Sequence, residues 1–330
     1  MNNGREDEVK AIIQEKYGGI DVLQYKEVER PQASSNEILI KNAYTSVNYA
    51  DLKKRRGNKE KGKFPMILGL DVAGTIEEAA EQSSFSIGDR VIAFPKNGSY
   101  SQYSVANEQL VFKIPDHLSF EQAAAMPTVS ILSYILLHDI GQVRADDTIV
   151  IHSAAGGVGT LITQLAKLAG IKTIIGTVGN LDKQDYVLKN GANFVYTYDE
   201  FAEKVMEITN SAGANIIFDS VAGEITRRSL DCLAFYGTLV QFGNSSGKAG
   251  SLTTNDVHNS CRNIKGFSFG TTRKHRPEIV APFAEKVIDL FANNKIKIPI
   301  ERVFDLSDAA KAHKRIESRQ HKGKVIIKIS

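Results

Sequence analysis

Cysteine is scarce in this sequence, and its scarcity excludes two common kinds of scaffold. The chain contains only Cys232 and Cys261 among 330 residues. Two cysteines cannot build a disulfide framework or a cysteine-rich metal site. Cys232 lies on an apolar helical face and Cys261 in a polar loop, so neither is expected to be a nucleophile. We therefore expect a reduced protein of the cytoplasm.

Long apolar runs and strong net charge are also missing. No segment has the length and hydrophobicity of a membrane span, and the polar start "MNNGREDEVKAI" lacks the apolar region of a secretory signal. The net charge of +3 is too small to indicate a nucleic-acid or membrane partner. Hydrophobic residues make up 42% of the chain and charged residues 24%, which is typical of globular proteins.

The length and the patterning of the chain predict two domains. Short alternating runs at 37–42, 89–94, 100–105 and 110–115 indicate an irregular antiparallel barrel. A capping box at Ser119 and Gln122 predicts the start of a helix after these strands.

From about residue 148 the rhythm changes to apolar runs that alternate with helical patterns. The runs lie at 148–152, 172–176, 194–196, 215–219, 238–242 and 264–269. Such alternation predicts a doubly wound parallel sheet, the Rossmann architecture, in an α/β fold. The alternating tail strand at 324–329 resembles the N-terminal strands, so we expect the tail to complete the first domain. The predicted boundaries are 1–125 and 271–330 for the barrel domain and 126–270 for the Rossmann domain.

A glycine-rich turn, "SAAGGVG" at 153–159, lies between a predicted strand and a predicted helix. It fits the dinucleotide fingerprint G-x-G-x-x-G with Ala154 in place of the first glycine. A tight turn, a close backbone and free amides at a helix N-terminus are what a pyrophosphate requires. The alternative is a plain turn, but the strand-turn-helix context favours a dinucleotide.

The end of the second Rossmann strand distinguishes between the two nicotinamide cofactors. An NAD site usually has an acidic residue there, about 20 positions after the fingerprint, but this chain has Gly176, Thr177 and Gly179. Lys183 follows, and Tyr198 ends the third strand, so a cation and a hydroxyl suit the 2′-phosphate of NADPH. The alternative for Lys183 is a solvated lysine at a helix start, and Asp182 beside it is a complication.

Several motifs occur in the order found in one known family. They are "SVNYADLKKRRG", "GLDVAG", "GDRV", "GSYSQY", "AAGGVG", "GTVGNLDK" and "FGNSSG". On these motifs the whole chain resembles the medium-chain dehydrogenase/reductase superfamily and, within it, the zinc-independent, zeta-crystallin-like quinone oxidoreductases, with a GroES-like catalytic domain. The pattern N-x-x-D-x-Y-x-R-x-G of that family corresponds to Asn48, Asp51, Lys53, Arg55 and Gly57.

The resemblance implies a site without metal. The zinc enzymes of the superfamily have ligand Cys and His where this chain has Asn48 and Leu70, and Leu cannot coordinate a metal. His138 and His152 have no partners at metal spacing, so a structural role is expected for both. A quinone or an activated enone needs less polarisation than a simple ketone, so positioning and hydrogen bonding can suffice.

The resemblance also implies site residues and an assembly. We expect Asn48 and Lys53 to be catalytic, with Asn48 orienting the substrate carbonyl or the nicotinamide ribose; the alternative for Asn48 is the cap of a turn. The "FGNSSG" loop is expected at the nicotinamide end, and the alternative is a Ser/Gly turn. A homodimer through the edge strand near "IKGFSF" is also implied. The expected cofactor-binding residues are Ala155, Gly156, Gly157, Val158, Gly159, Thr177, Gly179, Lys183, Tyr198, Phe242, Gly243, Asn244 and Ser245.

Two departures from the family pattern leave a second activity open. Lys53 stands where the family has Tyr, and Leu132 where it has a cofactor-contacting Thr. The first interpretation is an NADPH-dependent, metal-free reductase that passes hydride to a quinone in the interdomain cleft. The alternative is a reductase of enoyl or alkenal substrates. A third, weaker alternative is a cofactor-gated RNA-binding or structural protein, because 53–63 is basic; without interleaved aromatic residues, a solvated loop is the expectation there.

Overall fold

The chain folds into two compact units in the structure, a computed structural model that describes residues 8–58 and 62–330. Unit 1 comprises Met1–Thr128, Arg276–Asn294 and Ile298–Ser330. Unit 2 comprises Val129–His275 and Lys295–Lys297. Segments from both ends of the sequence therefore belong to unit 1.

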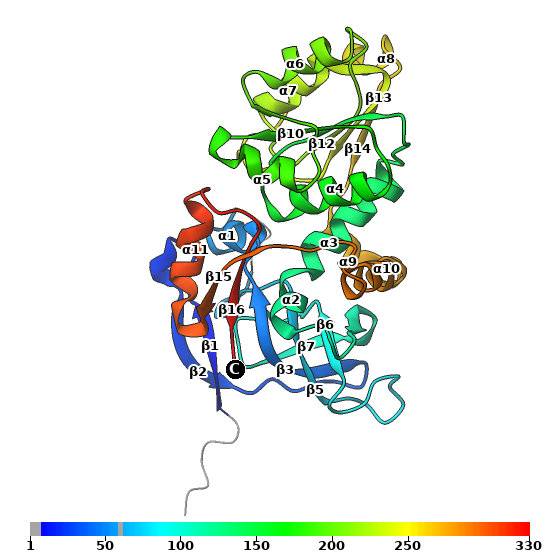
Figure 1. Ribbon diagram of the computed structural model, residues 1–330. Coiled ribbons are helices and arrows are strands. Elements are labelled where there is room, and N and C mark those ends of the chain that lie inside the picture. Colours follow the sequence, from blue (N-terminus) through cyan, green and yellow to red (C-terminus); the bar gives the residue numbers. More distant parts are fainter. Residues whose placement is uncertain (1–7, 59–61) are drawn as a thin grey trace, which may run out of the picture. The chain divides into compact units, whose positions relative to one another are not determined.

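Unit 1 is built mainly from antiparallel strands in two sheets (Figure 1). The smaller sheet has the order β2-β1-β4, and the larger has the order β15-β16-β3-β5-β6-β8, with β7 paired to β3. The strands of unit 1 are β1 (Glu8–Gln14), β2 (Gln24–Glu29), β3 (Glu37–Ser46), β4 (Met66–Ile67), β5 (Val72–Glu78), β6 (Arg90–Ala93), β7 (Tyr103–Asn107), β8 (Val111–Lys113), β15 (Ile300–Asp305) and β16 (Lys324–Lys328).

The core of unit 1 follows from the apolar residues of its central strand. Ile38 and Ile40 of β3 are fully buried and pack with Val72 of β5 and Val91 of β6. The helices of this unit are α1 (Tyr49–Arg55), α2 (Phe120–Ala125), α10 (Val280–Ala292) and α11 (Ala309–Glu317), with the single turns η1 (Ile20–Val22), η2 (Glu108–Leu110), η5 (Pro277–Ile279) and η6 (Leu306–Asp308). The predicted cap of α2 is present, since Ser119 Oγ accepts from the Gln122 amide at 3.2 Å.

The C-terminal tail is part of this core. β16 pairs antiparallel with β3, with Ile326 opposite Ser46. Val325 and Ile327 of β16 pack in one apolar cluster with α11 and with Ile12 of β1. The residues that precede α1 therefore lie beside the last strand of the chain.

Unit 2 contains one parallel sheet with the order β11-β10-β9-β12-β13-β14. The chain winds outward from β9 in one direction and from β12 in the other, which is the doubly wound topology. The predicted fold class, this α/β sheet plus an irregular, largely antiparallel barrel domain, is confirmed. The strands are β9 (Thr148–Ile151), β10 (Thr173–Val178), β11 (Phe194–Thr197), β12 (Ala214–Asp219), β13 (Leu233–Gln241) and β14 (Asn263–Gly266).

Helices cover both faces of this sheet, with α4 and α5 on one side and α6 and α7 on the other (Figure 1). Leu161, Ile162 and Leu165 give α4 its buried face, whereas Leu168 is 50% exposed, and Gly170 follows the helix with φ of 78°. The helices are α3 (Pro127–Tyr134), η3 (Ile135–Ile140), α4 (Gly157–Leu168), η4 (Leu181–Lys183), α5 (Gln184–Lys189), α6 (Phe201–Ile208), α7 (Glu224–Asp231), α8 (Thr254–His258) and α9 (Phe269–His275).

The basic run at 53–63 is only in part the solvated loop that the sequence predicts, since Arg56, Asn58 and Lys63 are exposed outside α1. Its first residues belong to α1, and the side chain of Arg55 is only 1% exposed. Residues 59–61 of the run lie outside the described part of the chain. The expectation was wrong for Arg55 because its partners, His313 and Glu317, are distant in the sequence.

None of the helices within residues 8–58 and 62–330 combines the length and the apolar character that a membrane crossing would require.

Candidate active site

The glycine-rich turn lies at the carboxyl edge of the parallel sheet, between β9 and α4. α4 begins at Gly157 after Gly156, and among the described residues no side chain caps it. Its first-turn amides are therefore available to an anion. At Gly159 a Cβ would lie 2.5 Å from the Ser153 carbonyl oxygen and 2.6 Å from Ala154 Cα. Only glycine allows the helix to approach the turn this closely. The turn and the start of the helix together form a backbone cradle of the kind that a pyrophosphate requires.

Tyr198 and β10 hold the turn in shape. The Ser153 amide donates to the Tyr198 hydroxyl at 3.1 Å, and the Ala154 amide donates to the Thr177 carbonyl at 3.0 Å. Ser153 has φ of 55°, a left-handed conformation that few non-glycine residues adopt. The Tyr198 hydroxyl, predicted to contact the cofactor, therefore has a partner within the turn, and burial raises its pKa.

Thr177, another predicted cofactor contact, is fully buried beneath the turn. The Ser229 hydroxyl donates to the Ile225 carbonyl at 2.7 Å, so its oxygen accepts from His152 Nε2 at 2.8 Å. His152 Nδ1 then accepts from the Thr177 hydroxyl at 2.8 Å. Burial lowers the pKa of His152 to about 4, in agreement with this neutral tautomer. Thr177 and His152 thus support the turn from below.

The loop after β10 places the predicted selectivity residues at the same edge of the sheet. Gly179 is exposed, and Lys183 ends the single turn η4 with its side chain half-buried. Asn180 binds the Asp182 side chain through Nδ2 at 2.8 Å and accepts from the Asp182 amide at 2.9 Å. The carboxylate that complicates the NADPH assignment is therefore bound to Asn180.

The "FGNSSG" loop follows β13, which ends at this edge as well. The Phe242 amide donates to the Asp219 carbonyl at 3.0 Å, and a Cβ at Gly243 would lie 2.8 Å from the Ser220 carbonyl oxygen. Ser245 donates from its amide to the same carbonyl at 3.0 Å. The structure thus brings the loops after β9, β10, β12 and β13 to one edge of the sheet, at the point where its winding reverses.

Asp219 is a functional candidate that sequence reasoning missed. It ends β12, is fully buried, and accepts from the amides of Val221 and Ala222 at 2.7 and 2.9 Å. Thr226 Oγ1 donates to its other oxygen at 2.7 Å. Asp219 thereby shapes the loop that lies beside "FGNSSG". Its position at the end of a buried strand was the only sequence signal.

In unit 1, Asn48 is the N-cap of α1 and forms a capping box with Asp51, the capping role that the sequence left as an alternative; it is buried, 6% exposed. Nδ2 donates to Asp71 Oδ2 at 3.1 Å and to Ser46 Oγ at 3.3 Å. Oδ1 accepts from Lys324 Nζ at 2.9 Å. The side chain therefore belongs to a buried polar cluster. Lys324 and its role in this cluster were missed by sequence reasoning.

Asp71 joins this cluster to the start of α3. Oδ1 accepts from Ser46 Oγ at 2.7 Å, and Oδ2 accepts from the Thr128 amide at 3.2 Å as well as from Asn48. The donor set does not fit zinc, because both oxygens of Asp71 and the Asn48 amide are engaged and Leu70 has no ligand atom. Within the described residues no group of three or more His, Cys, Asp or Glu side chains is arranged to hold a metal ion.

A second buried chain of polar groups leads into α1. Asp51 Oδ2 accepts from the backbone amide of Asn48 at 2.9 Å, and Oδ1 accepts from the backbone amide of Gly69 at 3.2 Å. The Tyr100 hydroxyl contacts both Asp51 and, at 3.0 Å, Nε2 of His313. Burial raises the pKa of Asp51 to about 6. This chain fixes the backbone from which Asn48 projects.

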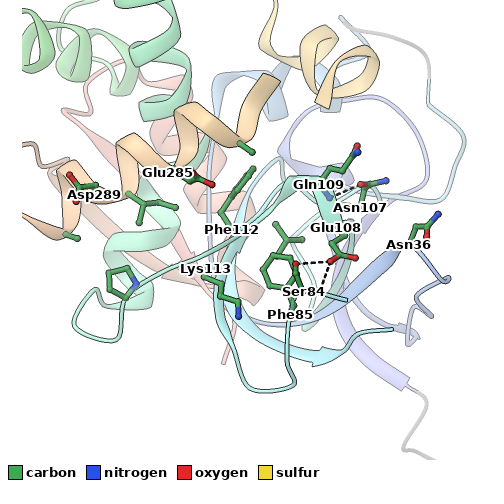
Figure 2. Close-up of a pocket in the computed structure, with 15 residues that line it drawn as sticks. Asn36, Ser84, Phe85, Asn107, Glu108, Gln109, Phe112, Lys113, Glu285 and Asp289 are labelled. Atoms are coloured by element: carbon green, nitrogen blue, oxygen red, sulfur yellow. Dashed lines mark hydrogen bonds between the residues drawn. The ribbon is translucent and has the colours of Figure 1, made fainter. Parts of the chain in front are cut away.

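The remaining candidates lie apart from these clusters. Lys53 is half-buried on α1, Leu132 is half-buried on α3, and His138 is exposed in η3 beside the Tyr134 ring, 4.4 Å between centroids. A groove of about 1070 Å³ lies between α10 and the η2–β8 segment, with Phe85, Phe112 and Glu285 in its walls (Figure 2). None of the predicted site residues lines this groove.

Comparison with known proteins finds a dehydrogenase family match in each of the two units. Residues 34–116 match the alcohol dehydrogenase GroES-like domain family, and residues 157–286 match the zinc-binding dehydrogenase family. A probable quinone oxidoreductase of Schizosaccharomyces pombe is 31% identical over 315 residues, 94% of each chain. A 2-haloacrylate reductase of a Burkholderia species is 28% identical over 97% of this chain and 98% of its own.

A solved structure extends the likeness to the fold. The quinone oxidoreductase of Escherichia coli, crystallised with NADPH, superposes with a TM-score of 0.91 and 30% identity, over 97% of this chain and 100% of its own. The chain therefore belongs to the quinone oxidoreductase family of the medium-chain dehydrogenase/reductase superfamily, a family of oxidoreductases.

Proposed function

We propose that this protein is an NADPH-dependent, metal-free reductase that converts a quinone to its hydroquinone. NADPH, when bound, supplies a hydride from C4 of its nicotinamide, and the overall reaction consumes one proton to give NADP⁺ and the hydroquinone. The observation that carries the proposal is the start of α4 within the Gly156–Gly159 cradle, which no side chain among the described residues caps. The relatives of this chain include a quinone oxidoreductase crystallised with NADPH. In this proposal unit 2 binds the cofactor, and unit 1 binds the quinone that accepts the hydride.

The amides of the α4 turn bind the pyrophosphate in this proposal. Ala155, Gly157 and Val158 contribute backbone close to the anion, and the helix dipole favours its negative charge. Phe242 through Ser245 line the nicotinamide end, since their loop lies at the same sheet edge. Tyr198 and Thr177 act by holding the turn, because their hydroxyl groups contact Ser153 and His152.

The preference for NADPH over NADH is assigned to Lys183 and Gly179. No carboxylate ends β10, where the ribose of NADH would be recognised, and the nearby Asp182 is bound to Asn180. A lysine at this position supplies a positive charge for the 2′-phosphate. The small Gly179 leaves room for that group.

The reduction needs a hydrogen-bond donor for the oxygen on which negative charge develops. Asn48 is assigned this role, because its second amide hydrogen has only a long contact of 3.3 Å with Ser46. Lys53 is assigned to the acceptor pocket from its place on α1, which begins directly after Asn48.

The absence of a metal requirement is part of the proposal. It is supported by the hydrogen bonds that already engage Asn48 and Asp71 and by Leu70 at the position of a ligand. A quinone accepts hydride without a Lewis acid because its product is a stabilised phenolate.

A second candidate activity is the reduction of an activated carbon–carbon double bond. It is favoured by the 28% identical 2-haloacrylate reductase, which covers nearly the whole chain. Initial rates with benzoquinone, a naphthoquinone and an enal, each with NADPH and with NADH, separate the two. Quinone turnover with NADPH supports the first candidate, and turnover of the enal alone would replace it with the second.

We propose a homodimer formed through β14, which is the edge strand of the parallel sheet in the part of the chain that the structure describes. An unpaired edge strand is a template for pairing with a second copy. The mass in solution tests this, and a monomeric mass at micromolar concentration would contradict it.

The compartment that fits best is the cytoplasm. Both cysteines are free and Cys261 is exposed, as is usual where thiols stay reduced. Fractionation of the native host cell tests this, and recovery outside the cytoplasmic fraction would contradict it.

A further inference from the structure

Lys324 is a buried lysine whose ammonium lies against the Asn48 amide. Its exposed fraction is 3%, and lysine is rarely buried unless it is paired. Nζ donates to Asn48 Oδ1 at 2.9 Å and to the Val47 carbonyl at 3.1 Å. Burial lowers the pKa of Lys324, while the charges of Asp71 and Asp51 oppose the shift. The lysine is thus held between the loop before α1 and two carboxylates.

The Asn48 amide lies between a group that only donates and a group that only accepts. A lysine ammonium has no acceptor, and an ionised carboxylate has no donor. With Oδ1 on Lys324 and Nδ2 on Asp71, both contacts are satisfied. A flipped amide would place N–H against the ammonium and the carbonyl against the carboxylate, and both hydrogen bonds would be lost. Only one orientation of Asn48 is therefore stable.

We propose that Lys324 and Asp71 are positioning residues that fix this orientation, so that Asn48 presents an N–H group to the acceptor carbonyl. This inference rests on the proposed function and names the residues that orient Asn48 for it. Nδ2 carries two hydrogens, of which one is held by Asp71 at 3.1 Å and the other contacts Ser46 at 3.3 Å. The longer contact is the one that a substrate oxygen replaces at low cost.

A lysine that only neutralised buried carboxylates would affect stability alone. A lysine that acts through Asn48 must lose its catalytic effect once Asn48 is removed. A double-mutant cycle of Lys324 with Asn48 separates these roles, because it measures their coupling and not the cost of either change.

The cycle uses K324M, N48A and the double variant, with K328M as the matched control. Lys328 is on the same strand, four residues along, and is exposed. The readouts are kcat/KM for benzoquinone at saturating NADPH, the NADPH Kd from fluorescence titration, and the Tm of each variant. K324Q, whose amide can donate or accept, is carried in parallel in case K324M is not recovered folded.

We expect K324M to lower kcat/KM by about tenfold or more, because an oriented donor contributes up to about 10²–10³ in rate. The NADPH Kd should change by less than about twofold, and in the N48A background K324M should change kcat/KM by less than about twofold. K328M should match the wild type.

The inference is overturned if K324M and K324Q retain the wild-type kcat/KM, or if their effect is equally large in the N48A background. A wild-type protein that reduces no quinone would instead refute the proposed function. If the wild type is active and the effects of K324M and N48A on kcat/KM simply add, only the positioning role of Lys324 would be refuted.

Discussion

The guanidinium of Arg55 lies 3.0 Å from Nδ1 of His313, and this contact fixes the protonation state of the histidine. Arginine only donates, so Nδ1 accepts and the ring hydrogen is on Nε2, from which it donates to the Tyr100 hydroxyl at 3.0 Å. The Tyr100 hydrogen is then directed to Asp51. Burial and the nearby charge of Arg55 lower the pKa of His313 to about 3.

This buried histidine predicts a loss of stability at mildly acid pH. Unfolded histidine takes up a proton near pH ~6.5, whereas native His313 does so near 3, so its stabilisation is lost as the pH falls through this window. Each such histidine lowers the free energy of unfolding by about 1.4 kcal/mol per pH unit. His152, with a native pKa of about 4, acts in the same direction.

Asp51 has the opposite effect on the free energy of unfolding as the pH falls. Burial raises its native pKa to about 6, so it binds its proton more tightly in the folded protein than in the unfolded one. The two histidines outweigh this single carboxyl. H313Q should therefore show a pH slope of stability smaller by about 1.4 kcal/mol per unit between pH ~4.5 and ~6. Urea unfolding at fixed pH values measures the slope, and an unchanged slope would contradict the neutral assignment of His313.

The glycine cradle predicts that G159A loses the cofactor. The added Cβ would lie 2.5 Å from the Ser153 carbonyl oxygen and 2.6 Å from Ala154 Cα, and backbone cannot retreat cheaply. We expect a destabilisation of about 1–3 kcal/mol and NADPH binding weaker by about tenfold or more. The control is G270A, where an added Cβ meets no described atom within 4 Å. Equal NADPH affinities for G159A and G270A would exclude this turn as the pyrophosphate site.

Lys183 predicts the cofactor preference. Replacing it by Met removes a charge that contributes about 1.5–3 kcal/mol in a hydrogen bond to a phosphate, so the ratio of kcat/KM for NADPH over NADH should fall about tenfold or more. The rate with NADH should remain within about twofold of the wild-type rate. K189M, at the exposed end of α5, is the control. A ratio unchanged in K183M would move the recognition of the 2′-phosphate to another residue.

The two thiols should differ in reactivity. Cys232 is buried, and burial raises its pKa to about 12, so it stays a thiol at neutral pH. Cys261 is exposed. A thiol reagent at pH ~8 should label one cysteine per native chain and both after denaturation, and C261S should abolish native labelling. Rapid labelling of Cys232 in the native protein would contradict its burial.

Local patterns predicted much of unit 2. Apolar runs identified the parallel strands, and the glycines of 153–159 identified the turn, because a strand-turn-helix with small residues is specified within one segment. The cap at Ser119 is local in the same way.

Contacts between distant segments were not predictable from one sequence. Arg55 was placed in a solvated basic run, yet its partner His313 lies 258 positions away. Lys324 was read only as a strand residue, and its partner Asn48 lies 276 positions away. Thr177 was predicted to contact the cofactor because it lies where an NAD site has its acidic residue. Its hydroxyl contacts His152, a partner 25 positions away that no local pattern indicates, and its contact with the cofactor stays a prediction.

In the proposed activity the enzyme reduces quinones with NADPH and needs no metal. The most direct test follows NADPH oxidation with benzoquinone after exhaustive dialysis against a chelator, with the hydroquinone formed quantified in the same sample. We expect the rate to equal that of the undialysed enzyme, with one hydroquinone formed per NADPH consumed. A rate that falls with dialysis and returns with zinc would show that the enzyme requires a metal and would overturn the proposed metal-free reaction.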